Sequence, residues 1–379
     1  GGSPMDRPTF SLGIEEEYLV VDRETRDLVS SPGEGFFEAC REALGDQVTP
    51  EFLQCQVEVG TRPHRTVADA INDLRSLRRG VAKAAESQGY GMIAASTHPF
   101  AQWRQQSHTQ KERYAGLWSD IGAPAWRMLI SGMHIHIGIE DEDQRIDLMN
   151  QAAYFLPHLL ALSGSSPVWE GQDTRLASYR LAGFDALPRT GLPDQVASYS
   201  EWRRLVDHLV HAGCVEAATK IWCDIRPSER YPTLEQRVTD VCPRVDDVEA
   251  IAAAYQSMIA YLFRLRTRNQ RWRIYPATLI RENRWRAQRY GVEGKMVDHG
   301  SSSLVEFGDL VEEMIDLFGD DAEALGCRHE LLGLRRVISE GTSAMRQRRT
   351  YAEALENGAD AQGALRSVVD QLMVEFVDG

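Results

Sequence analysis

Several familiar features are missing from this sequence of 379 residues. Its six cysteines include no C-x-x-C pair, and six scattered thiols in so long a chain fit a reducing cytosol better than a disulfide framework. No run approaches the roughly 18 apolar residues of a membrane span, and no signal peptide is visible. The net charge of −14 argues against nucleic-acid or anionic-membrane partners. We therefore expect a cytoplasmic protein that acts on small molecules.

Two large classes of phosphoryl-transfer protein are also excluded. The sequence has no G-x-x-x-x-G-K-[ST] loop, which rules out a P-loop fold, and it has no H-R-D or D-F-G set of the protein kinases. If the chain binds a nucleotide, sheet carboxylates and metal ions must replace the glycine-rich cradle.

The most informative stretch that is present covers residues 132–138, Gly-Met-His-Ile-His-Ile-Gly. In a strand, His134 and His136 would lie on one face and Ile135 and Ile137 on the other. One face would then carry two candidate ligands while the other packs into a core.

Three acidic stretches follow the same logic. Glu15 and Glu17 share a face in a strand over residues 9–22, and Glu235 and Arg237 share a face in a strand over residues 232–240. Glu51 and Glu58 lie in a predicted strand over residues 51–59. Their spacing of seven is odd, so a bulge or bend is needed to aim both side chains inward.

The remaining pattern predicts an α+β protein. Further strands are expected at residues 91–95 and 220–227, and a turn at 23–27 should lead to a short hairpin strand. Helical spacing is found in these segments: residues 36–44, 66–88, 110–121, 143–163, 201–212, 246–269, 277–290, 303–317, 322–337, 342–355 and 361–376.

No repeat or linker interrupts the chain, so we expect one domain over residues 5–379 with a mostly helical part at 244–379. Residues 1–4, ahead of Met5, are set aside as a vector remnant. Residues 164–198 break the regular pattern but contain aromatic and arginine side chains, which predicts an ordered lid or substrate loop.

Taken together, these carboxylates and imidazoles predict a site for hard divalent cations. Oxygen ligands suit Mg²⁺, with Mn²⁺ as the alternative, and clustered carboxylates are costly unless cations neutralise them. Arg226 and Arg237 could hold a phosphoryl group or a substrate carboxylate in a bidentate manner. Each motif alone has a plainer interpretation, because an E-x-E strand is more often a solvated face and an E-x-R strand an ion pair. Their combination in this order is more specific.

At these residues the sequence resembles the glutamate–cysteine ligase type 2 family, the carboxylate–amine ligases of the glutamine synthetase superfamily. The resemblance runs from about residue 9 to near the C-terminus. The matching stretches are residues 12–17 (LGIEEE), 54–58 (QCQVE), 96–100 (STHPF), 132–138 (GMHIHIG), 162–167 (LSGSSP), 171–175 (GQDTR), 222–227 (WCDIRP), 233–238 (TLEQRV) and 289–294 (RYGVEG).

This resemblance implies a curved antiparallel sheet around an ATP site, with helices outside. It also implies ATP-dependent amide formation through an acyl phosphate, with glutamate as the carboxylate and cysteine or another amine as the acceptor. By analogy Glu15, Glu58 and Glu235 are metal ligands, and Glu17, Glu51 and His134 complete the set. The resemblance further places Glu17, His136 and Arg237 at the nucleotide. It assigns Arg226 and Arg237 to the transferred phosphoryl group, with Glu51 as a further catalytic carboxylate.

Three other functions stay open at this point. A metal-dependent amide hydrolase could use the same residues without a nucleotide. A non-catalytic relative could bind nucleotide and regulate a partner, although the intact acidic set argues against it. A guanidino kinase shares the superfamily architecture. The identity of the amine is open too, and exposed helices would be compatible with a homo-oligomer.

Overall fold

The structure is a computed structural model that describes residues 6–379 except residues 52, 103–114 and 117. Its centre is a seven-stranded sheet in which every pairing is antiparallel. The strands are β1 (Leu12–Asp22), β2 (Val48–Pro50), β3 (Gln56–Gly60), β4 (Tyr90–Ile93), β5 (Met133–Gly138), β10 (Ile225–Pro227) and β11 (Thr233–Gln236). They follow the order β10-β11-β5-β1-β3-β2, and β4 pairs with β1 beside this path. The predicted α+β class with an antiparallel sheet is confirmed.

β1 organises this sheet, because three strands pair with successive parts of it. β5 pairs with Leu12–Glu16, β3 with Glu15–Leu19, and β4 with Leu19–Asp22. Side chains along β1 alternate between buried and half-buried from Leu12 to Tyr18. Its even-numbered residues therefore enter the core, and Glu15 and Glu17 point to the opposite face, as the period of two predicts.

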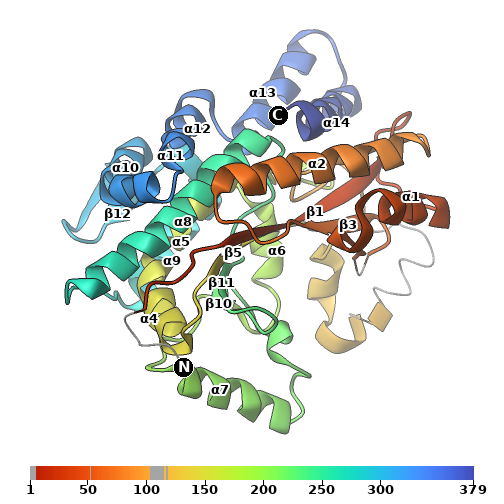
Figure 1. The fold of residues 1–379 in the computed structure, drawn as a ribbon. Helices are drawn as coiled ribbons and strands as arrows, with labels where there is room; N and C mark the ends of the chain where they lie inside the picture. Colours follow the sequence, from red (N-terminus) through yellow and green to blue (C-terminus); the bar gives the residue numbers. More distant parts are fainter. Residues whose placement is uncertain (1–5, 52, 103–114, 117) are drawn as a thin grey trace.

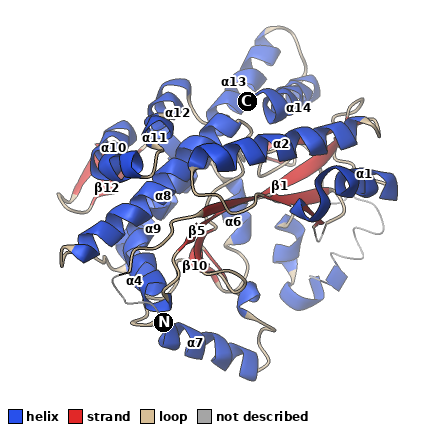
Figure 2. Ribbon diagram, in the orientation of Figure 1, coloured by secondary structure: helices blue, strands red, loops and turns tan. Residues whose placement is uncertain are grey.

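Helices surround the sheet (Figures 1 and 2). The longer ones are α1 (Glu34–Leu44), α2 (Val67–Glu86), α4 (Glu142–Ala152), α5 (Leu156–Ser163), α7 (Tyr199–His211), α8 (Val245–Thr267), α9 (Ala277–Tyr290), α10 (Phe307–Ala324), α13 (Ser343–Glu356) and α14 (Ala361–Asp378). The shorter ones are α6 (Tyr179–Phe184), α11 (Arg328–Leu332) and α12 (Leu334–Glu340). The helical character predicted for residues 244–379 is confirmed.

α2 shows why these boundaries fall where they do. Thr66 caps its N-terminus by accepting a hydrogen bond from the backbone N–H of Asp69. Val67, Ile71, Leu74 and related residues form a buried apolar stripe along one side. The chain leaves the helix through Gly89 at φ 77°, a conformation that glycine adopts without steric cost.

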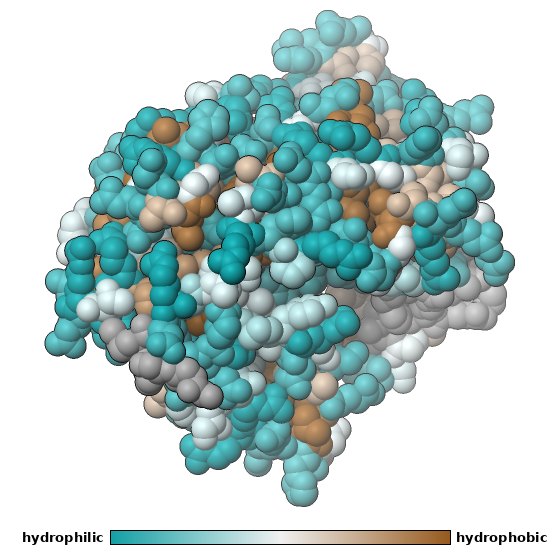
Figure 3. Space-filling model, viewed as in Figure 1, coloured by the Kyte–Doolittle hydropathy of each residue, from teal (hydrophilic) through white to brown (hydrophobic). Residues whose placement is uncertain are grey.

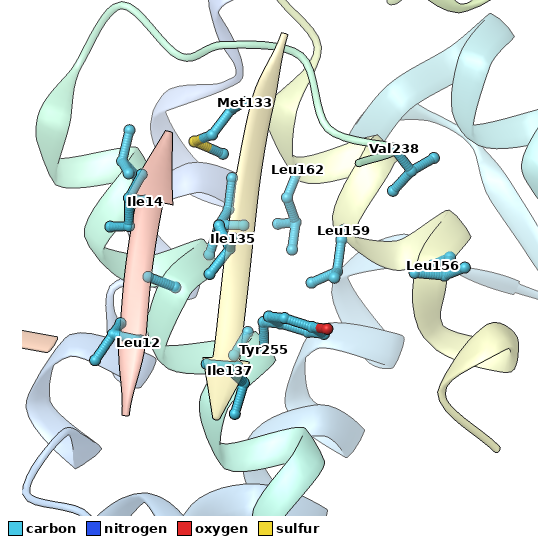
Figure 4. Close-up of a cluster of buried hydrophobic side chains, with 14 of the residues drawn as sticks. Leu12, Ile14, Met133, Ile135, Ile137, Leu156, Leu159, Leu162, Val238 and Tyr255 are labelled. Atoms are coloured by element: carbon cyan, nitrogen blue, oxygen red, sulfur yellow. The ribbon is translucent and has the colours of Figure 1, made fainter. Parts of the chain in front are cut away.

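The apolar faces of β1 and β5 form one wall of the main core (Figure 4). Ile135 and Ile137 of β5 lie beside Leu12 and Ile14 of β1 and face α5 and Tyr255 of α8. Ile135 and Ile137 are fully buried, so the predicted alternation of isoleucine and histidine is confirmed on its apolar side. The packed apolar face holds the histidine face of β5 in place.

Four predicted elements differ from the structure. Residue 51 and residues 53–55 are not strand, and residues 53–55 form a bend and turn before β3, which supplies the bend that the spacing of Glu51 and Glu58 required. Residues 303–306 form β13, paired with β12 (Lys295–Asp298), rather than a helix start. The helix predicted at 322–337 is broken at Gly326, where φ is 76°. The strand expected after residues 23–27 is reduced to a single bridge between Val21 and Leu28.

Residues 164–198 are built into the body of the protein rather than forming a plain loop. They contain β6 (Val168–Trp169), β7 (Gln172–Asp173), α6 and β8 (Thr190–Gly191), and β8 pairs with β9 (Trp222–Cys223). Half of the helix predicted at 110–121 lies outside the described residues, and the described half, residues 115–116 and 118–121, is helical.

The face of the molecule seen in Figure 3 is mainly hydrophilic with small separated apolar patches. None of the six cysteines forms a disulfide, and only Cys214 among them is exposed. Within the described part of the chain, no helix combines the length and apolarity needed to cross a membrane.

Candidate active site

The polar face of the sheet borders a cavity of about 490 Å³. The nine residues that the sequence singled out all line it, although they come from segments far apart in the chain: Glu15, Glu17, Glu51, Glu58, His134, His136, Arg226, Glu235 and Arg237. The convergence that the motifs predict is therefore present.

Strand register explains most of this convergence. Glu15 pairs across the sheet with His134, Glu17 with Glu58, and Glu235 with both His136 and Arg226. Residues directly opposite each other in antiparallel strands place their side chains on the same face, a few ångströms apart. One face thus carries a row of charged groups from β10 to β3.

Three of these groups form a compact cluster. Glu15, His136 and Glu235 each offer a ligand atom, and these atoms lie within 4.8 Å of one another. The Nε2 atom of His136 lies 2.8 Å from Oε1 of Glu15 and 3.1 Å from Oε2 of Glu235. It makes no aligned hydrogen bond with either oxygen, whereas Nδ1 contacts the hydroxyl of Thr233 at 2.8 Å. Thr233 thus fixes the imidazole with Nε2 between two carboxylates.

The charges in this cluster stabilise one another. Burial alone would lower the pKa of His136, but the two carboxylates raise that pKa to about 9. Burial would likewise raise the pKa values of Glu15 and Glu235, yet contacts with the imidazoles lower both well below the usual range. The protonated imidazole offsets part of the charge of the two carboxylates, and Arg226 pairs with Glu235 as well.

A second group of carboxylates forms no ion pair with a cation among the described residues, although the charges of Arg180 and Arg237 act on Glu17. Burial, together with the charge of Glu51, raises the pKa of Glu17 to about 8. Burial and a hydrogen bond with Glu51 raise the pKa of Glu58 well above its usual range. Three carboxyl groups share this end of the cavity, and Glu17 and Glu58 favour the protonated form because like charges cannot all be ionised together. A divalent cation would remove that constraint.

His134 lies beside Glu15, with Nδ1 3.7 Å from Oε2 of that residue. Burial and the charge of Arg237 lower its pKa to about 4, so the imidazole is neutral at pH 7. A neutral imidazole can ligate a metal ion.

The two predicted arginines have different surroundings. Arg226 donates to Oε1 of Glu235 at 2.5 Å and to three backbone carbonyls, those of Ala218, Thr219 and Ile221. Most of its donors are therefore committed to holding the protein. Arg237 reaches Glu235 only at 3.6 Å, and its buried Nε has no partner among the described residues. Arg237 is the guanidinium with donors left for a ligand.

The sequence did not single out several further residues of the cavity wall. Arg180 and Phe184 of α6, together with Leu187, come from the segment taken for a lid, and Trp222 and Tyr231 border the sheet. The aromatic and arginine content of residues 164–198 was the available signal, but it could not show that α6 packs against Gly132 at the start of the histidine strand.

The fold has known counterparts. A solved glutamate–cysteine ligase from Francisella tularensis, in complex with AMP, superposes with a TM-score of 0.66 and 16% sequence identity, over 97% of this chain and 89% of that chain. The architecture is that of a glutamate–cysteine ligase.

Sequence comparison identifies the family. The model of glutamate–cysteine ligase family 2 matches residues 11–371. A Rhodospirillum rubrum protein, provisionally named glutamate–cysteine ligase 2, is 51% identical over 377 residues, covering 98% of this chain and 97% of its own. A Ruegeria pomeroyi protein of the same name is 51% identical over 376 residues, covering 99% and 97%. The chain belongs to glutamate–cysteine ligase family 2 and thus to the ATP-dependent carboxylate–amine ligases.

Proposed function

We propose that this protein joins the γ-carboxylate of glutamate to an amine, with cysteine as the first candidate, and that ATP phosphorylates the carboxylate before the amine attacks. The observation that carries the proposal is the meeting of nine predicted carboxylate, imidazole and guanidinium residues in one cavity. Family membership and the AMP complex of the Francisella tularensis enzyme support the use of ATP.

The residues present fit divalent cations. His136 presents a buried nitrogen without a hydrogen bond, between two carboxylates, and the Glu17, Glu51 and Glu58 group carries acid groups in excess of nearby cations. This oxygen-rich donor set suits Mg²⁺ or Mn²⁺ rather than zinc. We assign Glu15, His136 and Glu235 to one cation, and Glu17 and Glu58 to further cations, with His134 beside Glu15. Such cations would offset the charge of the ATP phosphates.

This assignment differs from the sequence-based expectation in the roles of the two histidines. His134 was expected as a metal ligand and His136 near the nucleotide, but His136 is the imidazole that joins the cluster with Glu15 and Glu235. Either histidine retains a ligand role in the proposal, and His136 has the shorter contacts.

Arg237 is the candidate for stabilising the transferred phosphoryl group. A carboxylate is a poor electrophile, and phosphorylation turns it into a mixed anhydride with a good leaving group. Negative charge then moves across the phosphoryl oxygens, where the planar fork of Arg237 could donate two hydrogen bonds. Arg226 supports this step by holding Glu235 and the 218–221 turn in place. Glu51, on the turn before β3, is the candidate for taking the proton of the amine.

The test is release of ADP by the purified protein with Mg²⁺, glutamate and a panel of amines, with the products identified by mass spectrometry. We expect ADP release only when both glutamate and an amine are present, together with a γ-glutamyl amide of the matching mass. Amide cleavage without nucleotide would instead support the hydrolase. Binding of ATP without turnover of any pair would support the non-catalytic relative. We also propose a cytoplasmic location, which the free thiols favour.

A further inference from the structure

Arg180 of α6 is a buried guanidinium on the wall of the cavity. It is 3% exposed. Its Nη1 donates to the backbone carbonyl of Val238 at 3.1 Å, and its Nη2 donates to that of Arg237 at 3.0 Å. These acceptors are neutral. Among the described residues no carboxylate forms an ion pair with Arg180, so its charge is buried without a counter-charge in contact.

Most other buried arginines in the described part of the protein form ion pairs. Each of four others contacts a carboxylate: Arg78 with Glu16, Arg226 with Glu235, Arg284 with Asp224 and Arg346 with Glu375. Arg145 also lacks an ion pair in the described part of the chain, but it lies outside the cavity, against the ring of Tyr199. A buried cation without a partner is unfavourable. On the cavity wall, an anionic ligand can supply the missing partner.

Two buried carboxylates, those of Glu17 and Asp240, act on the charge of Arg180 without forming an ion pair with it, and both already accept hydrogen bonds from other groups. Glu17 accepts one from the backbone N–H of Gly132 at 3.0 Å. Asp240 accepts hydrogen bonds from the backbone of Ser165 at 2.9 Å and from the hydroxyls of Ser166 and Ser178, both at 2.7 Å. These serines satisfy both of its oxygens without Arg180. The same network holds the arginine, because the backbone N–H of Arg180 donates to the Ser166 hydroxyl at 3.1 Å.

The position of the guanidinium is also defined by its neighbours. The guanidinium carbon Cζ of Arg180 lies 5.5 Å from the centre of the Phe184 ring. On the other side lies Gly132, where an added Cβ would approach Nη2 of Arg180 to 2.5 Å. The glycine that begins the histidine strand therefore leaves the space that Arg180 occupies. A charged fork held this firmly is preorganised for an anion.

We propose that Arg180 binds a substrate carboxylate that takes no part in the reaction. This inference rests on the ligase function proposed above. The reacting carboxylate belongs with the cations and Arg237, whereas a guanidinium fork elsewhere on the wall can grip a second carboxylate by two hydrogen bonds. Such a group distinguishes an α-amino acid from a simple acid or amine. It comes from the α-carbon of glutamate or from an amino-acid acceptor such as cysteine.

Two substrate pairs separate these sources. 4-Aminobutyrate keeps the reacting carboxylate of glutamate but lacks the α-carboxylate, and cysteamine is cysteine without its carboxylate. We would measure kcat/KM for all four compounds with the wild type and Arg180→Gln. In the variant, the preference for glutamate over 4-aminobutyrate, or for cysteine over cysteamine, should fall on the order of 10- to 100-fold, the worth of hydrogen bonds to a charged group. The pair that responds identifies the carboxylate.

Two further variants guard against a merely structural effect. Arg145→Gln removes a buried arginine away from the cavity and should leave both preferences at the wild-type value. Gly132→Ala crowds Arg180 and should lower the same preference that Arg180→Gln lowers. Wild-type preferences in a folded Arg180→Gln protein would overturn the proposal, since loss of folded protein scales all rates but does not change their ratio.

Isothermal titration calorimetry with the same compounds measures their affinities without turnover, so the role of Arg180 can be tested independently of the ligase proposal. If no pair of substrates releases ADP, the ligase proposal fails, yet the binding preferences still decide the role of Arg180. If the wild type binds each compound and its decarboxylated analogue equally, Arg180 has no carboxylate ligand. If Arg180→Gln removes a preference shown by the wild type, the assignment stands.

Discussion

The two faces of β1 carry the same residue type in opposite circumstances. Glu16 points into the core and is fully buried, but both its oxygens accept hydrogen bonds from Arg78 at 3.0 Å, and the Tyr18 hydroxyl donates to it at 2.5 Å. On the other face, Glu17 shares its surroundings with further carboxylates, and burial with the charge of Glu51 raises its pKa to about 8. Of these two adjacent glutamates, Glu16 has its hydrogen-bond and charge partners within the protein, whereas Glu17 lies among carboxylates without an ion-paired cation in the described residues.

The difference separates structural charges from functional ones. A buried charge whose partners all come from the protein contributes to holding the fold. A buried charge without enough partners implies a ligand that provides them. On this view the core side of β1 should respond to mutation through stability, and the cavity side through binding and turnover.

The largest effect is expected on the core side. Arg78→Met leaves Glu16 buried without its counter-charge and should lower the free energy of unfolding by about 3–5 kcal/mol. Urea unfolding followed by circular dichroism measures it. The double variant Glu16→Gln, Arg78→Met is the matched control and should recover part of the loss. Equal stability of Arg78→Met and the wild type would show that the ion pair between Glu16 of β1 and Arg78 of α2 does not stabilise the packing of these two elements.

On the cavity side, Glu15→Gln and Glu58→Gln should each reduce turnover by about 10²–10³-fold or more, because each removes a charge that acts on the phosphates through a cation. Glu58→Gln should keep the stability of the folded state, since it relieves repulsion among carboxyl groups, whereas Glu15→Gln should lose some stability because Glu15 and His136 stabilise each other. Steady-state ADP release and thermal unfolding check the two statements. Glu140→Gln, which lies outside the cavity, is the control. Wild-type rates in either cavity variant would show that the side chain holds no cation.

A smaller loss is expected for Arg237→Lys. Lysine keeps the charge but not the planar fork, so kcat should fall roughly 10- to 100-fold, the worth of a hydrogen bond to a charged group. The KM for ATP should change less than kcat does. An unchanged kcat would make the contact with Glu235 the better account of this residue.

The smallest effect is expected at the N-terminus of α2, which tests whether the core side of β1 acts on stability alone. Thr66→Ala removes the N-cap of α2, a helix behind the core face of β1, and should cost about 1 kcal/mol of stability. Turnover per folded molecule should stay at the wild-type value. A loss of turnover without a loss of stability would mean that α2 couples to the cavity.

The sequence alone predicted which side chains share a face of the sheet, because side chains in a strand alternate with a period of two. Glu15, Glu17, His134 and His136 were placed on the correct face by counting alone. Glu51 required the bend and turn at residues 53–55, whose existence the odd spacing indicated but whose direction it could not give.

What escaped prediction depends on contacts between distant segments. The role of Arg180 arises from packing of α6 against Gly132 and from the serines around Asp240, which no local pattern reports. β13 was taken for helix because Leu304 and Val305 continue the apolar spacing of α10, and pairing with β12 overrides that preference. The contrast between Arg226 and Arg237 likewise required knowing which carbonyls lie nearby.

The central claim is that carboxylates and imidazoles from separate strands form one binding site for divalent cations. Electron paramagnetic resonance titration of Mn²⁺ in the presence of ATP tests it most directly, with the wild type, Glu15→Gln and Glu235→Gln. The account predicts saturable binding to the wild type and affinities weakened about 10- to 100-fold in each variant. The same Mn²⁺ affinity in all three proteins would contradict it.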